Sequence, residues 1–292
     1  MKDITERITV YSAFYRAMRE GNITSAAREA AKSGARTVEF LDTVKRPAVA
    51  DRETARRYRA VLKDHGLTVA CFSAAARLWD PDRSDAEAAS EEARLLRLAQ
   101  MAAELGSPYL HHTVVMTWDT QTPYNEVLDR VTEPAVRVAE YARSLGVRVL
   151  YEPQGFYFNG NDGFRGLYRR VKAACPTVGV CTDIGNPMFV DEDPLLFVKE
   201  FARETCHVHV KDYRVCASAP DRSKGGRGLD PVLLGTGEVH AAECLSVLAD
   251  AGYTGYFGVE DDGDAAFAAS RDAVARAFKI SKAGSDTEGD RV

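Results

Sequence analysis

The sequence lacks the signals that several classes of protein require. No apolar run approaches the roughly 20 residues of a membrane-spanning helix, and the N-terminus has no apolar stretch behind a basic start. The six cysteines form no CxxC pair, so neither a thiolate zinc motif nor a dithiol redox motif is indicated. We therefore expect a cytoplasmic protein, without membrane contact, whose cysteines stay reduced.

Basic clusters and glycine-rich phosphate loops are also missing. The net charge is −5, and the charges are scattered as on solvated helix faces, which predicts no nucleic-acid partner. Residues 11–22, after the first β-like run, contain neither GxGxxG nor GxxxxGK[ST]. This absence disfavours an open, doubly wound sheet that binds a nucleotide.

What the chain does have is a regular alternation of β-rich and helical patterns. The β-rich runs begin near residues 8, 37, 68, 109, 147, 178, 206 and 256. Five helical patterns between them end at glycines suited to the left-handed position after a helix: Gly34, Gly66, Gly106, Gly146 and Gly252. Because a βα unit needs about 30 residues, eight units in this length predict a closed barrel.

We predict the fold class α/β, a single (β/α)8 TIM barrel over residues 1–282 that includes a C-terminal helix. Residues 283–292 are small and charged, and we expect a disordered tail there. Pro134 is expected to start a helix rather than lie inside one. The long connection 213–239 follows the seventh strand and could act as a lid on the catalytic face.

Four β-rich runs end on residues that bind metals: Glu152, Asp183, His209 and Glu260. In a barrel of this kind the active site lies at the carboxyl ends of the strands, so these side chains should meet. An oxygen-rich set suits Mn²⁺, Mg²⁺ or Co²⁺ better than a thiolate-built zinc site. The alternative is a structural polar cluster without an ion.

Residues next to these strand ends are further candidates. Strand alternation places His207, His209 and Lys211 on one side, with His207 deeper in the barrel. Lys211 could reach a substrate oxygen and is a candidate catalytic residue, or it could pair with Asp212 or another acid. Glu39 could orient a ligand or close a buried pair.

Other polar and aromatic residues could line a sugar pocket. His111 and His112 are adjacent, so at most one should face it, and His112 is our candidate catalytic residue. Trp79 and Trp118 could wall the pocket or pack against helices. The remaining candidates could hydrogen-bond substrate hydroxyls: Gln154 and Asn186.

At these residues the chain resembles the sugar phosphate isomerase/epimerase superfamily, the xylose isomerase-like barrels. The resemblance spans about residues 8–280 and rests on the segments ARTVEFLD, LYEP, TDIGNP, HVHVKDY, LLGTGEV and GYFGVED. It implies that Glu152, Asp183, His209 and Glu260 bind one divalent ion, usually Mn²⁺, with Mg²⁺, Co²⁺ or Zn²⁺ possible. It also implies that Glu152 and Glu260 flank the substrate as acid and base in the epimerases.

Two segments depart from the ketose 3-epimerase pattern. Where those enzymes carry DxxH and HxGExxR, this chain has DIGN at 183–186 and HVKDYR at 209–214. The HxKD pattern is more similar to inosose dehydratases. We predict a metal-dependent isomerase or epimerase of a small keto sugar or polyol, with a lyase or a non-catalytic sugar-binding subunit as alternatives. We expect it to assemble as a homo-oligomer.

Overall fold

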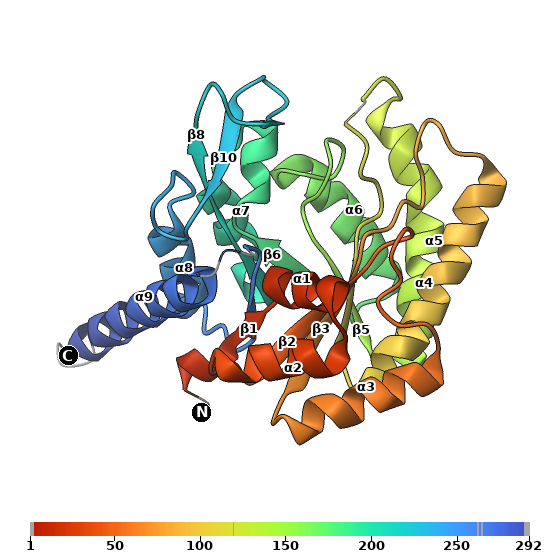
Figure 1. The fold of residues 1–292 in the computed structure, drawn as a ribbon. Helices are drawn as coiled ribbons and strands as arrows, with labels where there is room; N and C mark the ends of the chain where they lie inside the picture. Colours follow the sequence, from red (N-terminus) through yellow and green to blue (C-terminus); the bar gives the residue numbers. More distant parts are fainter. Residues whose placement is uncertain (1–2, 119, 262, 264, 289–292) are drawn as a thin grey trace.

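The computed structural model describes residues 3–118, 120–261, 263 and 265–288. Eight parallel strands close into a barrel in the order β1-β11-β7-β6-β5-β4-β3-β2 (Figure 1). The barrel strands are β1 (Ile8–Val10), β2 (Thr37–Asp42), β3 (Thr68–Ala74), β4 (Tyr109–His112), β5 (Arg148–Tyr151), β6 (Gly179–Asp183), β7 (Thr205–Val210) and β11 (Tyr256–Val259). The predicted TIM barrel is confirmed.

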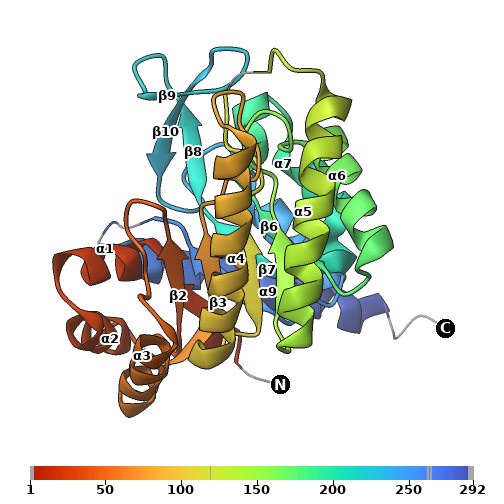
Figure 2. The same cartoon turned by 90° about the vertical axis from the view of Figure 1, so that its right-hand side faces the viewer.

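Helices surround the barrel, as Figure 2 shows for α4 and α5 in front of the strands. The α-helices are α1 (Ser12–Glu20), α2 (Ile23–Lys32), α3 (Arg52–Asp64), α4 (Asp85–Leu105), α5 (Tyr124–Ser144), α6 (Asn161–Ala174), α7 (Pro194–Phe201), α8 (Ala241–Asp250) and α9 (Ala266–Glu288). Short 3-10 helices occupy η1 (Ile4–Arg7), η2 (Asn186–Val190) and η3 (Ala202–Glu204). Among the described helices, none is long and apolar enough to cross a membrane.

Local sequence signals explain where several helices begin and end. Ser84 caps α4 in a capping box with Glu87, and Asn22 caps α2 in the same way with Ser25. The five glycines predicted to follow helices all have positive φ, from 71° at Gly66 to 85° at Gly34. Each therefore lets the chain turn directly into the next strand.

Two helix boundaries differ from the prediction. Pro134 lies inside α5, so the prediction that it starts a helix is wrong. Buried apolar residues continue on both sides of it, from Val131 to Val138, and their packing holds the helix together across the proline. Helix α9 passes the predicted boundary at residue 282 and runs to Glu288; the rest of the predicted tail, residues 289–292, lies outside the described residues.

The connection after β7 forms a small sheet of its own. Strands β8 (Asp212–Val215), β10 (Gly228–Val232) and β9 (Asp221–Arg222) pair in an antiparallel sheet that rises beside α7 in Figure 1. Asp212 at its base is buried, and its carboxylate accepts hydrogen bonds from the backbone N–H groups of Tyr213, Gly235, Gly237 and Val239. One side chain thus ties the start of this segment to its end.

Candidate metal centre

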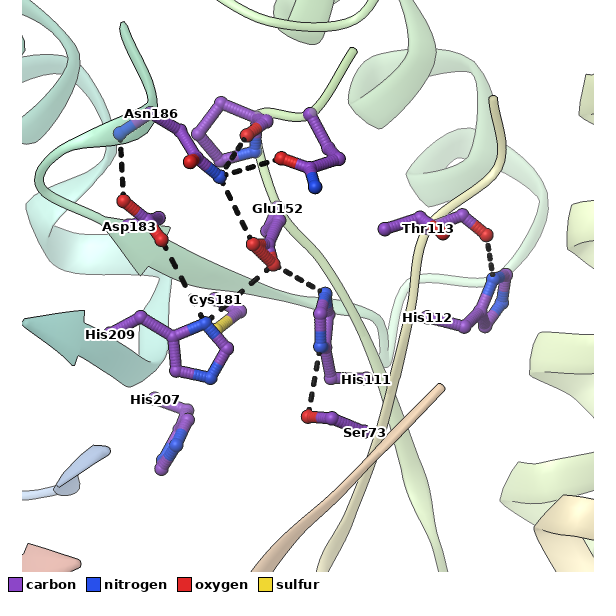
Figure 3. Close-up of polar contacts among 12 residues, drawn as sticks. Ser73, His111, His112, Thr113, Glu152, Cys181, Asp183, Asn186, His207 and His209 are labelled. Carbon is purple, nitrogen blue, oxygen red and sulfur yellow. Dashed lines mark hydrogen bonds and ion pairs between the residues drawn. The ribbon is translucent and has the colours of Figure 1, made fainter. Parts of the chain in front are cut away.

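The structure brings the four predicted ligands together around the ring of His209. Its Nδ1 atom lies 3.6 Å from Glu152 Oε2. It lies 4.0 Å from Asp183 Oδ2 and 4.0 Å from Glu260 Oε2. Figure 3 shows Glu152 and Asp183 pointing toward this nitrogen. Asp183 and His209 lie in β6 and β7, and Glu152 and Glu260 directly follow β5 and β11. These four strands are neighbours in the barrel, so their carboxyl ends converge.

The other face of His209 is held from inside the barrel. Its Nε2 atom lies 2.9 Å from Glu39 Oε1, and the ring of Tyr11 stacks on it at 4.9 Å. Nδ1, on the opposite side of the ring, faces the three carboxylates. Burial lowers the pKa of His209, but Cys181, Glu39 and Glu152 outweigh burial and raise it well above its usual value, so a cation bound at Nδ1 would replace a proton there. A histidine that donates one N–H to a carboxylate and offers the other nitrogen is the usual arrangement of a metal ligand.

Glu39 is fully buried and joins several polar groups beneath the site. It lies 2.8 Å from His207 Nε2 and accepts a hydrogen bond from Ser73 Oγ. Burial opposes its ionisation, but His209 and His207 outweigh burial and hold the pKa of Glu39 well below its usual value. Gly258 makes room for this group, because a Cβ there would lie 2.5 Å from Glu39 Oε2. Glu39 therefore makes both of the predicted contacts. It holds His209 Nε2, and it forms a buried pair with His207.

Glu152 is positioned by His111 rather than by His112. His111 Nε2 lies 2.8 Å from Glu152 Oε2, and its Nδ1 lies 3.0 Å from Ser73 Oγ (Figure 3). His112 packs on Tyr151, and its Nδ1 is bonded to the carbonyl of Thr113, so the choice of His112 as the pocket-facing histidine is wrong. Alternation decides this: His111 shares a register position with Leu150, which lies on the same side of β5 as Glu152. Burial lowers the pKa of His112 to about 4, which suits a neutral structural ring.

The two carboxylate oxygens of Asp183 have different surroundings, and only Oδ2 faces His209. Its Oδ1 accepts hydrogen bonds from the N–H groups of Gly185 and Asn186, both at 2.8 Å. Its Oδ2 is buried without a properly directed hydrogen bond, although the ammonium of Lys211 lies 2.8 Å away. Burial raises the pKa of Asp183 to about 7, with Glu260 and Glu152 adding to the effect and Lys211 opposing it. Burial and the two neighbouring carboxylates thus disfavour the charged form of Asp183, and Lys211 offsets part of that effect.

Lys211 lies between two of the carboxylates. Its ammonium is 2.8 Å from Asp183 Oδ2 and 2.8 Å from Glu260 Oε2. Burial opposes the charge, but these two acids raise the pKa of Lys211 well above its usual value, so the side chain remains an ammonium. Asp212, the partner considered from sequence, is not involved. Glu260 is the most open of the four predicted ligands, with 31% of its side chain exposed.

The remaining predicted pocket residues have structural contacts. Asn186 Nδ2 donates to Glu152 Oε1, to the carbonyl of Pro153 and to Gln154 Oε1, so it orients the Glu152 carboxylate. Trp79 packs against Tyr157, whereas Trp118 is 56% exposed beside Phe156 and Phe189.

Sequence reasoning missed three residues that shape the site. They are Tyr11, which stacks on His209; Ser73, which links Glu39 to His111; and Cys181, whose Sγ lies 3.7 Å from His209 Nδ1. Ser73 and Cys181 lie on β3 and β6. Their alternation with outward apolar residues was the only available signal.

The donors form two overlapping groups that share His209, and each group has the chemistry to hold a divalent cation. Donor atoms about 2.1 Å from a common ion lie no more than about 4.2 Å apart, and the separations around His209 Nδ1 satisfy this limit. Asp183, His209 and Glu260 offer atoms that all lie within 4.8 Å of one another, as do Glu152, Cys181 and His209. The undirected Oδ2 atom of Asp183 is the feature that a bound cation would satisfy.

Comparisons with known proteins identify the family of this chain. Residues 27–282 match the family described as the xylose isomerase-like TIM barrel, and the chain belongs to that family. Among curated proteins, no sequence matches this chain significantly.

Solved structures share the fold over nearly the whole chain. An L-ribulose 3-epimerase has a TM-score of 0.76 at 15% identity, with 98% of each chain covered. A xylose isomerase-like TIM barrel protein from Mycobacterium smegmatis in complex with magnesium has a TM-score of 0.71 at 18% identity, covering 96% of this chain and 99% of that one. The probable 3-DHS dehydratase AsbF from Bacillus anthracis has a TM-score of 0.66 at 15% identity, covering 94% and 98%.

Proposed function

We propose that the protein is a divalent-metal-dependent isomerase or epimerase that removes a proton next to the carbonyl of a keto sugar or polyol. The observation that carries this proposal is the arrangement at His209, where Nδ1 faces three carboxylates and Nε2 is held by Glu39. Family membership supports a small sugar-like substrate. We also propose a cytoplasmic homo-oligomer, as expected from sequence.

Glu152, Asp183, His209 and Glu260 would hold the ion, which we expect to be Mn²⁺. A matched structure in complex with magnesium supports a divalent ion without selecting among Mn²⁺, Mg²⁺, Co²⁺ and Zn²⁺. When bound, the ion supplies Lewis-acid polarisation of a carbonyl and the neighbouring hydroxyl.

The protein's own residues would then move the proton. Glu260 is the partly exposed carboxylate of the set, so it can approach a C–H bond of a substrate that enters from the barrel mouth. Glu152, which also faces His209 Nδ1, is the second candidate acid–base group. Lys211 carries a positive charge beside Glu260 and can stabilise an oxygen that becomes negative during the reaction.

The second half of the reaction distinguishes the alternatives. Returning the proton to the opposite face gives an epimer, and returning it to the neighbouring carbon gives an isomer. Loss of a β-substituent instead gives a lyase; the match to a probable dehydratase of the same fold keeps this candidate. A non-catalytic sugar-binding subunit is the remaining possibility.

The experiment is incubation in D₂O with Mn²⁺ and a panel of ketoses, 3-keto glycosides, inososes and dehydroshikimate, followed by NMR. We expect deuterium at the carbon next to the carbonyl, and loss of that exchange in Glu260→Gln by about 10²–10⁴-fold. Release of water or an aglycone would assign the lyase. Equal exchange in Glu260→Gln and the wild type would contradict the role of Glu260.

A further inference from the structure

A thiol lies on the inner side of the metal centre. Cys181 precedes Asp183 by two residues in β6 and is fully buried. In the register of the sheet Cys181 pairs with His207, whereas Asp183 pairs with His209, so Cys181 lies one step deeper in the barrel. Its Sγ atom is 3.7 Å from His209 Nδ1, the nitrogen that faces the carboxylates (Figure 3). The thiol is therefore a donor at the same nitrogen as the predicted ligands.

The distances from His209 Nδ1 separate a near and a far pair of donors. In a tetrahedral zinc site, with bonds of about 2.3 Å to sulfur and about 2.0–2.1 Å to nitrogen and oxygen, a sulfur lies about 3.6 Å and an oxygen about 3.4 Å from the nitrogen. The distances here are 3.7 Å to Cys181 Sγ and 3.6 Å to Glu152 Oε2. Asp183 and Glu260 are farther, at 4.0 Å each. Glu152, Cys181 and His209 thus have nearly the spacing of three ligands around a small tetrahedral ion.

The two pairs also differ in chemical softness. Asp183 and Glu260 supply only carboxylate oxygens, which suit Mn²⁺ or Mg²⁺, whereas the sulfur of Cys181 favours Zn²⁺. Glu39 and His207 lie near His209 too, but Glu39 contacts both histidines at hydrogen-bond distances of 2.8 and 2.9 Å. Those donors satisfy one another without an ion.

A hard ion and a thiophilic ion would need the same nitrogen. A ring nitrogen offers one lone pair, so His209 Nδ1 binds one ion at a time, and the other ring nitrogen is held from inside the barrel. Glu152 Oε2 also belongs to both sets of donors. An ion held by Cys181 would therefore exclude an ion held by Asp183 and Glu260.

We propose that Glu152, Cys181 and His209 form an inhibitory site for thiophilic divalent ions, Zn²⁺ above all, that competes with the catalytic ion for His209. On binding, the thiol releases its proton to solvent, and the ion forms one bond each to sulfur, nitrogen and oxygen without any change of oxidation state. This ion is held by buried donors and not by Glu260, the partly exposed carboxylate at the barrel mouth. The inhibition rests on the proposed function, whereas the binding site rests on the distances and the donor chemistry.

The first measurement is titration of the metal-free protein with Cd²⁺, a thiophilic stand-in for Zn²⁺ whose bond to a thiolate absorbs in the ultraviolet. The wild type should gain this sulfur-to-metal absorption at one equivalent. Cys181→Ser and Cys181→Ala should lose it, and Cys244→Ser, at a buried cysteine of α8, should keep it. Absence of the absorption in the wild type, or its persistence in Cys181→Ser, would overturn the site.

The second measurement is competition with Mn²⁺, followed by the electron paramagnetic resonance signal of free Mn²⁺. Zn²⁺ should release bound Mn²⁺ from the wild type and from Cys244→Ser. Cys181→Ser should lower the affinity for Zn²⁺ at least about tenfold more than the affinity for Mn²⁺, because it removes only the soft donor. Simultaneous binding of both ions to one chain would overturn the competition.

Proton exchange in D₂O separates this inference from the proposed function. We expect Mn²⁺-dependent exchange in the wild type and its suppression by Zn²⁺. Exchange without the Cd²⁺ absorption would support the metal enzyme and overturn the thiolate site. The Cd²⁺ absorption and Mn²⁺ release, without exchange on any substrate of the panel, would support the site and count against the proposed function.

Discussion

At the scale of single residues, His209 has two fixed tasks. One ring nitrogen is held by Glu39 and the other faces three carboxylates, so the ring cannot turn without losing a buried hydrogen bond. Lys211 adds the one ammonium of this cluster, between Asp183 and Glu260. The predictions at this scale concern His209 and Lys211.

We expect His209→Ala to lose bound metal. The substitution removes the nitrogen donor and leaves Glu39 without one of its partners. Elemental analysis should find about one Mn²⁺ per wild-type chain and much less in the variant. His65→Ala, at the residue that caps the carboxyl end of α3, is the matched control. Equal metal content in wild type and His209→Ala would refute the ligand assignment.

Lys211→Met should destabilise the metal-free protein more than the metal-loaded protein. Without the ammonium, Asp183 and Glu260 become unpaired, and breaking such a buried pair costs about 3–5 kcal/mol. A bound divalent ion replaces much of the missing charge. Thermal melts with Mn²⁺ and with a chelator measure the difference, and the same loss of Tm in both conditions would count against this account. Slower turnover of the loaded variant is expected from the proposed catalytic role of Lys211.

The error at His112 shows a limit of residue-level prediction. Adjacent histidines at a strand end are chemically equivalent in the sequence. The direction of each follows from the register of β4 against β5, which is a property of the sheet.

At the scale of elements, two features fix the backbone around the site: the close approach of β11 to Glu39 and the hydrogen bonds of Asp212 in the connection after β7. Strand β11 passes so close to Glu39 that only a glycine fits at position 258. Strand β8 begins with Asp212, whose carboxylate organises the segment up to Val239. Each of these positions gives a prediction.

Gly258→Ala should lower both stability and metal affinity. The new methyl group would lie 2.5 Å from Glu39 Oε2 and 3.1 Å from His209 Cδ2, so the ring of His209 must shift. Overpacking of this kind costs about 1–3 kcal/mol. Val259→Ala, which removes an outward side chain of the same strand, should lower stability but leave metal affinity intact. Equal metal affinities for wild type and Gly258→Ala would show that Glu39 does not position His209.

Asp212→Asn should loosen the segment 213–239. The amide replaces one acceptor oxygen with a donor that faces backbone N–H groups, and each unsatisfied buried donor costs about 1–3 kcal/mol. Limited proteolysis should cut this segment faster in the variant than in the wild type. The control is Asp221→Asn, at an exposed position in β9. Unchanged proteolysis would mean that the small sheet holds the segment without Asp212.

At the scale of the whole molecule, closure of the barrel depends on β1, which pairs with both β11 and β2. The four proposed ligands belong to β5, β6, β7 and β11, which follow one another around the ring, with β11 next to β1. An ion that binds four neighbouring strands should therefore stabilise the folded barrel as a unit.

Removal of metal should lower the Tm of the whole protein in one transition. At a free-ion concentration 100 times the dissociation constant, binding stabilises the native state by about 2.7 kcal/mol. Calorimetry after dialysis against a chelator, and again after Mn²⁺ is restored, measures the change. His209→Ala should show no Mn²⁺-dependent shift; a shift equal to that of the wild type would place the stabilising ion elsewhere.

The sequence by itself determined the strand–helix alternation, the glycines that end the helices and the four acidic or imidazole residues at strand ends. These are local patterns, because periodicity and turn preferences act over a few residues. Tertiary structure decided that His111 rather than His112 faces Glu152, that Pro134 lies inside a helix, and that Ser73 and Tyr11 support the site. It also placed Cys181 Sγ 3.7 Å from His209 Nδ1, although the sequence has no cysteine motif. The physical reason is that barrel closure brings the ends of distant strands together, and only the register between strands fixes which side chains meet.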